Sequence, residues 1–243
     1  METVEKNKIS LLLELKPFKN NQEEKNEIFV DAMKEAIFHH IKNSVEFKKI
    51  CKNQGFDFKE NFQLEQIPYF PVSIFKKFNL ISIPENNIFK TIFSSATTSK
   101  IPSKIILDRI TSERQTKALV SIMSDFLHEK MDFFILDTKE TISSIDEVKS
   151  RSSAIRGFLP FMKSIKFTLH DDLTINGLEL QNIKDQNQYC FFGFTWLIYK
   201  IIKENKNNEN IKKYLSKLKS PYILHLGGWK KLADLNISRE EFY

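Results

Sequence analysis

The sequence predicts an α/β protein with mostly parallel sheets flanked by helices. Two short apolar runs, DFFILD at 132–137 and QYCFFGF at 188–194, have the length of strands that are buried on both faces. A further strand is expected at YILHLGG, residues 222–228, and amphipathic segments lie between these runs. Strands that alternate with helices favour a parallel sheet covered on both faces.

The N-terminal part predicts a helical region over residues 1–66. Residues 26–50 place apolar side chains at four-residue spacing, which indicates one amphipathic helix: Phe29, Met33, Ile37 and Ile41. Pro68, Pro71 and Pro84 then interrupt any long helix. We therefore expect a helical region at 1–66 and an α/β core at 67–243, incomplete at its C-terminus.

Within the core, the first predicted strand is 103–108. A helix follows, with Thr111 or Ser112 as its N-cap and Ser112 with Gln115 as a capping box. After the strand at 132–137 come a polar loop rich in Ser and Thr, a helix near 152–164 and a strand at 166–169. The remaining expected elements are helices at 172–186, 195–205 and 207–220 around the last two strands.

Charge and cysteine content exclude several classes of protein. There are 37 basic and 31 acidic side chains, a formal charge of +6, and this diffuse excess suits anionic small molecules as well as nucleic acid. No aromatic-rich RNA-binding signature or zinc-finger spacing is present, so no nucleic-acid partner is expected. Cys51 and Cys190 are too few and too far apart for a disulfide framework, which indicates a reducing compartment. Without a signal peptide or about eighteen consecutive apolar residues, the chain is predicted to be cytoplasmic, with no membrane span.

One loop, FSSATTSKIPSK at 93–104, is unusually rich in hydroxyl groups and ends in lysines. Hydroxyl and backbone N–H donors beside a lysine can surround phosphate oxygens. It is not a Walker loop, which requires two glycines that are absent here. Composition alone also allows a polar turn whose Ser and Thr side chains bond the local backbone.

The loop resembles the phosphate-binding loop of adenylate-forming enzymes, SSGTTG followed by a basic or polar residue and proline. The blocks IPYFPVSIFKKFNLIS, PSKIILDRITSERQTKALVSIM, FFILD, FFGFTWLIY and LHLGGWKKL, in this order, narrow the resemblance to the acyl-protein synthetase (LuxE-like) family, from about Ile67 to the C-terminus. The fold expected is that of the large N-terminal domain of adenylate-forming enzymes.

The resemblance implies a ligase that uses ATP and Mg²⁺ to convert a carboxylic acid, most often a fatty acid, into an acyl-adenylate and then transfers the acyl group to a thiol. An acyl-accepting protein or a reductase is the implied partner, although a CoA acceptor is not excluded. The implied pyrophosphate-binding residues are Ser94, Ser95, Thr97, Thr98 and Lys100. Ala96 and Ser99 depart from the two glycines of the usual loop, and an Ala that had to adopt φ > 0 would cost roughly 1 kcal/mol or more.

Two further segments acquire roles through the resemblance. Gly227 and Gly228 match the Gly-Gly segment that lets the backbone approach adenine, while a turn that simply ends a strand is the alternative. The turn Phe192, Gly193, Phe194, Thr195 and Trp196 is expected to border the acyl pocket. Core packing is equally open for Phe191 and Leu197.

No catalytic residue and no metal ligand is assigned within the chain. Cys190 lies in an apolar strand and is expected to be an inert thiol, and no hydrolase motif is present. The family's YGxTE segment, ribose-binding Asp, C-terminal-domain Lys and acyl-accepting cysteine would lie beyond Tyr243. We therefore expect weak ATP binding and slow or no turnover by this chain. A non-catalytic remnant that binds a partner or a carboxylate is the alternative.

Overall fold

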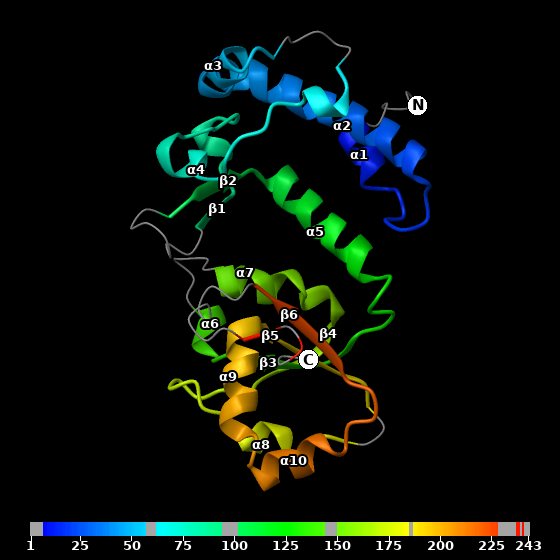
Figure 1. Cartoon of the computed structure of the whole chain (residues 1–243), viewed down its shortest axis with the longest axis vertical. Helices are drawn as coiled ribbons and strands as arrows, with labels where there is room; N and C mark the ends of the chain where they lie inside the picture. The colour runs from blue at the N-terminus through cyan, green and yellow to red at the C-terminus, as the bar shows by residue number, and fades with distance from the viewer. Residues whose placement is uncertain are drawn as a thin grey trace. The chain divides into compact units, whose positions relative to one another are not determined.

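The computed structural model of the chain describes residues 7–56, 62–93, 102–143, 150–184, 187–227, 237–238 and 240. The chain divides into two compact units, Met1–Phe126 and Leu127–Tyr243. The first is mainly helical and the second is built on a parallel sheet (Figure 1). Over the described ranges, no helix is both long and apolar enough to cross a membrane.

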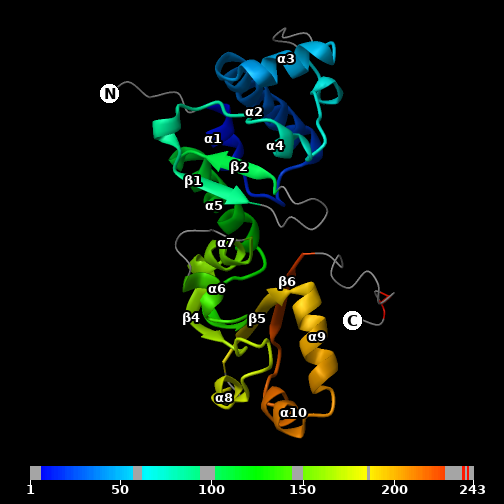
Figure 2. The same cartoon turned by 90° about the vertical axis from the view of Figure 1, so that its left-hand side faces the viewer.

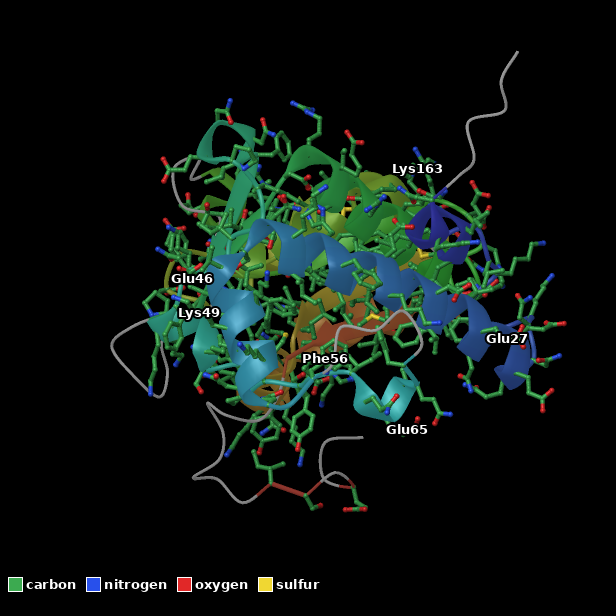
Figure 3. The ribbon with its side chains drawn as sticks, turned by 90° about the horizontal axis from the view of Figure 1, so that it is seen from above. Glu27, Glu46, Lys49, Phe56, Glu65 and Lys163 are labelled. Atoms are coloured by element: carbon green, nitrogen blue, oxygen red, sulfur yellow. The ribbon has the colours of Figure 1, made fainter. Side chains whose placement is uncertain are left out.

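The first unit begins with three helices, α1 (Lys8–Leu12), α2 (Gln22–Asn43) and α3 (Val45–Asn53). The helix expected at 26–50 is broken at Ser44, whose backbone is extended and whose buried side chain accepts a hydrogen bond from the Phe47 amide at 3.3 Å. A serine that caps a new helix in this way competes with continuation of the old one. Figure 3 shows Glu27 of α2 and Glu46 and Lys49 of α3 on the outside of these helices.

The rest of the first unit contains short elements. They are η1 (Leu64–Gln66), α4 (Ile74–Lys77), η2 (Glu85–Asn87), β1 (Lys90–Phe93) and β2 (Lys104–Leu107). β1 and β2 pair antiparallel in a two-stranded sheet, with Phe93 opposite Lys104. The chain after Phe93 thus runs between two antiparallel strands and does not leave a strand of a parallel sheet.

The last helix of the first unit, α5 (Arg109–Met123), begins earlier than the sequence predicted. Asp108 is the N-cap: its Oδ1 accepts a hydrogen bond from the Thr111 amide at 2.7 Å. Thr111 and Ser112 lie inside the helix, so neither is the cap and the predicted capping box is wrong. An Asp directly after β2 has the short carboxylate that an N-cap requires, and it also complements the helix dipole.

The second unit contains the sheet β4-β3-β5-β6, in which every neighbouring pair is parallel. The strands are β3 (Met131–Leu136), β4 (Met162–Phe167), β5 (Tyr189–Phe194) and β6 (Tyr222–Leu226). The connecting elements are α6 (Glu140–Ser143), α7 (Ser150–Gly157), η3 (Leu159–Phe161), α8 (Gly177–Leu180), α9 (Thr195–Asn205) and α10 (Glu209–Leu215). This arrangement confirms the predicted α/β class.

Helices cover both faces of the sheet. Phe134 and Leu136 of β3 and Phe191 of β5 point to the face that packs on α8, α9 and α10, in one cluster with Leu180, Ile198 and Ile211. The alternate residues point the other way, where the ring of Phe192 lies 5.1 Å from that of Phe158 at the end of α7. Figure 2 shows α7 and α9 on opposite sides of the strands. This two-sided burial explains the continuous apolar runs of β3 and β5.

Three segments differ from the prediction. The helix expected near 152–164 ends at Gly157, and β4 begins at Met162, four residues before the strand expected at 166–169. In the described part of the segment expected to be a helix at 172–186, only the short α8 is an α-helix, because residues before it form a turn closed by the bridge between Leu169 and Ile175. The polar loop after β3 contains the single-turn helix α6. In the 172–186 segment, Asp172 accepts a hydrogen bond from the Thr174 amide and Asn176 accepts one from the Leu178 amide, and these local bonds replace the regular helix that residue spacing suggested.

Candidate functional site

The connections between the strands identify the carboxyl ends of β3 and β5 as the candidate site. The chain leaves β3 toward α6 and α7 and leaves β5 toward α9, which lies on the opposite face. β3 and β5 are neighbours in the sheet, with Leu136 paired to Gly193. A reversal of this kind opens a crevice beyond the carboxyl ends of the two strands, where open α/β sheets bind ligands.

Asp137 stands at the carboxyl end of β3. It is 2% exposed, and its Oδ1 accepts hydrogen bonds from the Thr138 amide at 2.8 Å, Thr141 Oγ1 at 2.8 Å and Arg151 Nη1 at 2.9 Å. A buried carboxylate needs such compensation for its lost hydration. The cluster therefore fixes α6 and α7 against the end of β3.

The turn after β4 is held by a second set of polar contacts. Thr168 is fully buried, and its hydroxyl donates to the Ile135 carbonyl at 3.1 Å. Asp172 Oδ1 accepts from both the amide and the hydroxyl of Thr174, at 2.9 and 2.6 Å. Leu173, between Asp172 and Thr174, has φ +65°, a left-handed conformation that costs roughly 1–2 kcal/mol for a residue with a Cβ. Its side chain packs against the core cluster, which offsets that cost.

Two exposed carboxyl groups interact across the turns that follow β3 and β4. Protonated Asp171 donates a hydrogen bond to the Glu140 carboxylate, which raises the pKa of Asp171, and the Glu140 charge acts in the same direction. The same hydrogen bond lowers the pKa of Glu140. A proton added to this pair therefore resides on Asp171, and the edge of the sheet has an acidic rim near β4.

Thr195 begins α9 directly after β5, with no intervening loop. It is 3% exposed, and its Oγ1 lies 3.0 Å from His225 Nδ1, 3.2 Å from the Leu226 carbonyl and 2.9 Å from the Gly227 carbonyl. All three partners belong to the end of β6 or the residue after it. One hydroxyl thus joins the carboxyl ends of two neighbouring strands.

Gly227 follows β6 in a conformation that favours glycine. Its φ is +89°, and a Cβ placed there would lie 3.1 Å from Cδ1 of Phe194. Both the dihedral angle and the contact oppose a side chain at this position. The predicted close approach of backbone at Gly227 is therefore compatible with the local geometry, while Gly228 lies outside the described residues.

The other predicted site residues fall into two groups. The loop residues Ser94, Ser95, Thr97, Thr98 and Lys100 lie outside the described residues, as do Ala96 and Ser99. The predicted pocket residues lie at the junction of β5 and α9: Phe192, Gly193, Phe194, Thr195 and Trp196. Of these, Phe192 is 1% exposed against Phe158, and Trp196 packs beside the core cluster.

The polar groups at the ends of β3 and β4 were not among the residues predicted from the sequence. The signal for Asp137 was present, because a carboxylate directly follows an apolar run and precedes Thr138. The link between Thr195 and His225 had no signal in the sequence, since the two residues are separated by 30 positions and meet only through the parallel register of β5 and β6.

Both cysteines are buried and chemically protected. Burial raises the pKa of Cys190 to about 12 and also raises that of Cys51, and neither side chain is exposed. A nucleophilic cysteine needs a thiolate near neutral pH. The expectation that Cys190 is an inert core thiol agrees with this environment.

The first unit contains a separate groove of about 750 Å³, lined by residues of α1, α2, β2 and α5 and of the segment 79–83. In it His40 Nδ1 lies 2.7 Å from Ser82 Oγ, and burial, followed by the neighbouring charge of His39, lowers the pKa of His40. None of the predicted site residues that the structure describes lines this groove. Among the residues that the structure describes, no group of three or more His, Cys, Asp or Glu side chains could hold a metal ion.

Comparison with known protein families gives one match across nearly the whole chain. The model of the family described as "Acyl-protein synthetase, LuxE" matches residues 2–243. The chain is also 25% identical over 230 residues to a long-chain-fatty-acid–luciferin-component ligase of Vibrio harveyi, and 24% identical over 249 residues to one of Aliivibrio fischeri. These alignments cover 90% and 96% of this chain but 58% and 61% of the relatives, so the chain spans about three fifths of their length.

Solved structures with a similar fold include 2-hydroxyisobutyryl-CoA ligase in two states. An open conformation with 2-HIB-AMP and CoA matches with a TM-score of 0.58 and 12% identity, over 83% of this chain and 47% of that one. A postadenylation state with 2-HIB-AMP matches with a TM-score of 0.59 and 13% identity, over 83% and 43% of the two chains. At this identity the likeness shows a common fold.

Proposed function

This chain belongs to the LuxE acyl-protein synthetase family, and from that membership we propose that it takes part in the ATP-dependent activation of a long-chain fatty acid. The observation that carries the proposal is the extent of the family match, from residue 2 to residue 243. The relatives named long-chain-fatty-acid–luciferin-component ligases support the choice of acid, and the fold shared with 2-hydroxyisobutyryl-CoA ligase is compatible with it.

In the proposed reaction, a carboxylate oxygen of the fatty acid attacks the α-phosphorus of ATP. The bond from that phosphorus to the bridging oxygen breaks, pyrophosphate leaves with the electron pair, and an acyl-adenylate forms. Negative charge increases on the departing phosphates, where preorganised donors are most effective. We assign this role to the loop residues Ser94, Ser95, Thr97, Thr98 and Lys100. Bound Mg²⁺ would neutralise part of the same charge.

We assign the base of the nucleotide to the end of β6. Gly227 has the left-handed backbone and the absent side chain that a close approach to a flat ring requires. Gly228 is proposed to share this role. The position at the carboxyl edge of a parallel sheet supports the assignment, because ligands of such sheets bind beyond the ends of the strands.

We place the border of the acyl pocket at Phe192, Gly193, Phe194, Thr195 and Trp196. Phe192 and Gly193 are packed inside the sheet layer, whereas Phe194 is the last residue of β5 and is half-buried. Phe194 and Trp196 are therefore the members of this segment that we expect to contact the substrate. Aromatic side chains suit an apolar acyl chain.

The acceptor of the acyl group is proposed to be a protein thiol, in keeping with the family description "Acyl-protein synthetase", with CoA as the second candidate. Neither cysteine described here suits that role. Cys190 is held as a neutral thiol by burial inside β5, and Cys51 is buried in α3. The acceptor is therefore expected to come from outside the described residues.

The proposal is tested by ATP binding and by exchange of labelled pyrophosphate into ATP. Binding is measured by calorimetry for the wild-type chain, for Lys100→Ala and for Lys104→Ala, a matched exposed lysine at the start of β2. We expect Lys100→Ala to weaken ATP binding roughly tenfold, as expected for the loss of a charge-assisted contact, and Lys104→Ala to change it less than twofold. Fatty acids with chains of different length are then compared for stimulation of exchange.

These measurements also separate the alternative functions. A non-catalytic binding module predicts that the wild-type chain binds a fatty acid without ATP and that Lys100→Ala and Thr97→Val change nothing. Exchange that depends on the acid supports activation. Transfer of the activated acyl group is then tested with CoA and with a protein fraction that contains the acceptor. If CoA accepts the acyl group and the protein fraction does not, the acceptor is CoA and the proposal of a protein acceptor is wrong.

A further inference from the structure

We propose that Thr195 and His225 form a latch that holds the turn at Gly227 in the conformation required to receive the nucleotide. The inference rests on the proposed function, because it takes the end of β6 as the place where the base of ATP binds. Thr195 was assigned above only to the border of the acyl pocket. In the latch, Thr195 instead fixes the backbone of Gly227 and so positions the surface that the nucleotide contacts.

The contacts of Thr195 are unusually concentrated. Its hydroxyl has three polar neighbours, at 2.9, 3.0 and 3.2 Å, and all of them lie within residues 225–227. Because the residue is 3% exposed, water cannot easily replace these contacts. Thr195 is itself fixed between β5 and α9, where Leu197 is fully buried. A rigid element therefore supports the turn.

Counting protons assigns the direction of each hydrogen bond. A threonine hydroxyl has one proton to donate. The two carbonyl oxygens of Leu226 and Gly227 can only accept, so that proton must be directed toward them, with the closer Gly227 oxygen at 2.9 Å favoured. His225 Nδ1 must then carry a proton and donate it to Oγ1 at 3.0 Å. The latch runs from the imidazole N–H through the hydroxyl to the backbone of the turn.

The turn needs such support because of the residue that forms it. Glycine populates many backbone conformations with similar energy, so an unsupported Gly227 would lose much entropy when it is fixed by a ligand. The hydroxyl proton, directed toward the Gly227 carbonyl at 2.9 Å with the Leu226 carbonyl beside it at 3.2 Å, selects the left-handed conformation, φ +89°, before the ligand binds. Preorganisation of this kind increases affinity without any contact between Thr195 and the ligand.

A purely structural role for Thr195 makes a different prediction, and the same sheet offers a matched control. Thr168 is another fully buried threonine at the end of a strand, and its hydroxyl also donates to a backbone carbonyl, that of Ile135, at 3.1 Å. It has no hydrogen bond to residues 225–227. Replacing either threonine with valine removes one buried hydroxyl and keeps the shape of the side chain.

The experiment compares Thr195→Val, Thr195→Ser and Thr168→Val with the wild-type chain. Thermal unfolding reports stability, and calorimetric titration with ATP at a temperature where every variant is folded reports affinity. We expect Thr195→Val to weaken ATP binding roughly tenfold and Thr195→Ser, which keeps the hydroxyl, less than about twofold. Thr168→Val should lower the Tm by a similar amount but leave the Kd for ATP unchanged.

Nitrogen-15 NMR of the imidazole of His225 provides a readout that needs no ligand. Wild-type protein and Thr195→Ser should show a protonated, hydrogen-bonded Nδ1, and this signature should be lost in Thr195→Val. If Thr195→Val does not fold, His225→Phe serves in its place: it removes the Nδ1 donor and keeps a ring at that position, and it should weaken ATP binding by a smaller factor than the loss of the hydroxyl.

The outcomes distinguish the latch from the function on which it rests. If the wild-type chain binds ATP and Thr195→Val or His225→Phe binds it equally well, the latch is wrong and the proposed function stands. An equal loss of affinity in Thr168→Val also overturns the latch, because it shows a general effect of stability. If the wild-type chain binds no ATP, the proposed function fails, and the nucleotide role of Thr195 fails with it.

Discussion

The guanidinium of Arg151 and the carboxylate of Asp137 are joined by a hydrogen bond of 2.9 Å between Nη1 and Oδ1. The carboxylate is 3% exposed at the end of β3, and the arginine, on α7, is 34% exposed. The pair therefore links the carboxyl end of β3, where the connections of the sheet reverse direction, to α7, the helix that covers one face of the sheet. Each of the two residues can be removed separately, which tests how firmly that helix is attached.

We expect Arg151→Ala to destabilise the fold by about 1–3 kcal/mol, because it removes one of three donors from a buried carboxylate. The figure is below that of a fully buried pair since the arginine is one third exposed. Urea unfolding measures the change. The control is Arg156→Ala on the same helix, where the guanidinium donates to the Ile142 carbonyl rather than to a charge. An equal loss in both variants would show that the charge of Asp137 does not matter.

Gly193→Ala should destabilise the protein by about 1–3 kcal/mol through overpacking. A Cβ at this position would lie 2.9 Å from Cβ of Leu136 and 3.2 Å from Cγ1 of Ile198, between β3 and α9. Gly177→Ala is the control, because its nearest neighbour would be Cδ1 of Ile211 at an ordinary 3.5 Å. Thermal unfolding of the two variants compares them directly. A Gly193→Ala protein as stable as the wild type would show that the strands separate easily here.

Cys190 and Cys51 should resist a disulfide reagent such as DTNB in the native protein. With a pKa of about 12, roughly one Cys190 in ten thousand is a thiolate at pH 8, and the side chain is also buried. Absorbance at pH 8 should show reaction of both thiols only after guanidinium is added. Rapid reaction of one thiol in the native state would mean that its strand or helix opens on the timescale of the assay.

Glu140→Gln should lower the pKa of Asp171 toward its ordinary value. The Glu140 carboxylate accepts a hydrogen bond from protonated Asp171 and carries a negative charge, and both raise that pKa; glutamine removes the charge and offers an amide donor to the ionised form. An NMR titration of the Asp171 carboxyl carbon measures the change. Glu179→Gln, which removes a charge that does not act on Asp171, should leave it unaltered.

The direction of the pH effect on stability follows from the same shift. Because the folded pKa of Asp171 is raised, this group stabilises the fold at pH values below its unfolded pKa of about 3.9. The contribution is lost as the pH rises through the raised folded value. In Glu140→Gln this dependence should shrink, and an unchanged titration of Asp171 would exclude a direct interaction between the two carboxyl groups.

Local patterns in the sequence were sufficient for most elements of the second unit. The apolar runs that became β3 and β5 are long enough to cross a sheet and too short for a helix, and α9 has the predicted bounds, 195–205. Such patterns depend on neighbouring residues, so they can be recognised without knowledge of the rest of the chain.

Local patterns failed where one hydrogen bond decided between two nearly equal conformations. Ser44 ends α2 and begins α3 although the apolar spacing continues through it, and Asp108 caps α5 in place of Thr111 or Ser112. In each case several residues had suitable side chains. The differences in cap preference among Ser, Thr and Asp are only a few tenths of a kcal/mol, too small to choose between neighbours.

By itself the sequence determined the α/β class, the positions of the buried strands along the chain and the membership of a family of acyl-protein synthetases. Only the tertiary structure decided that β1 and β2 are antiparallel, that Asp137 is buried beside Arg151, and that Thr195 meets His225 and Gly227. The physical reason is that strand orientation and register depend on contacts between distant residues. A side chain's hydrogen-bond partners are known only when that register is known.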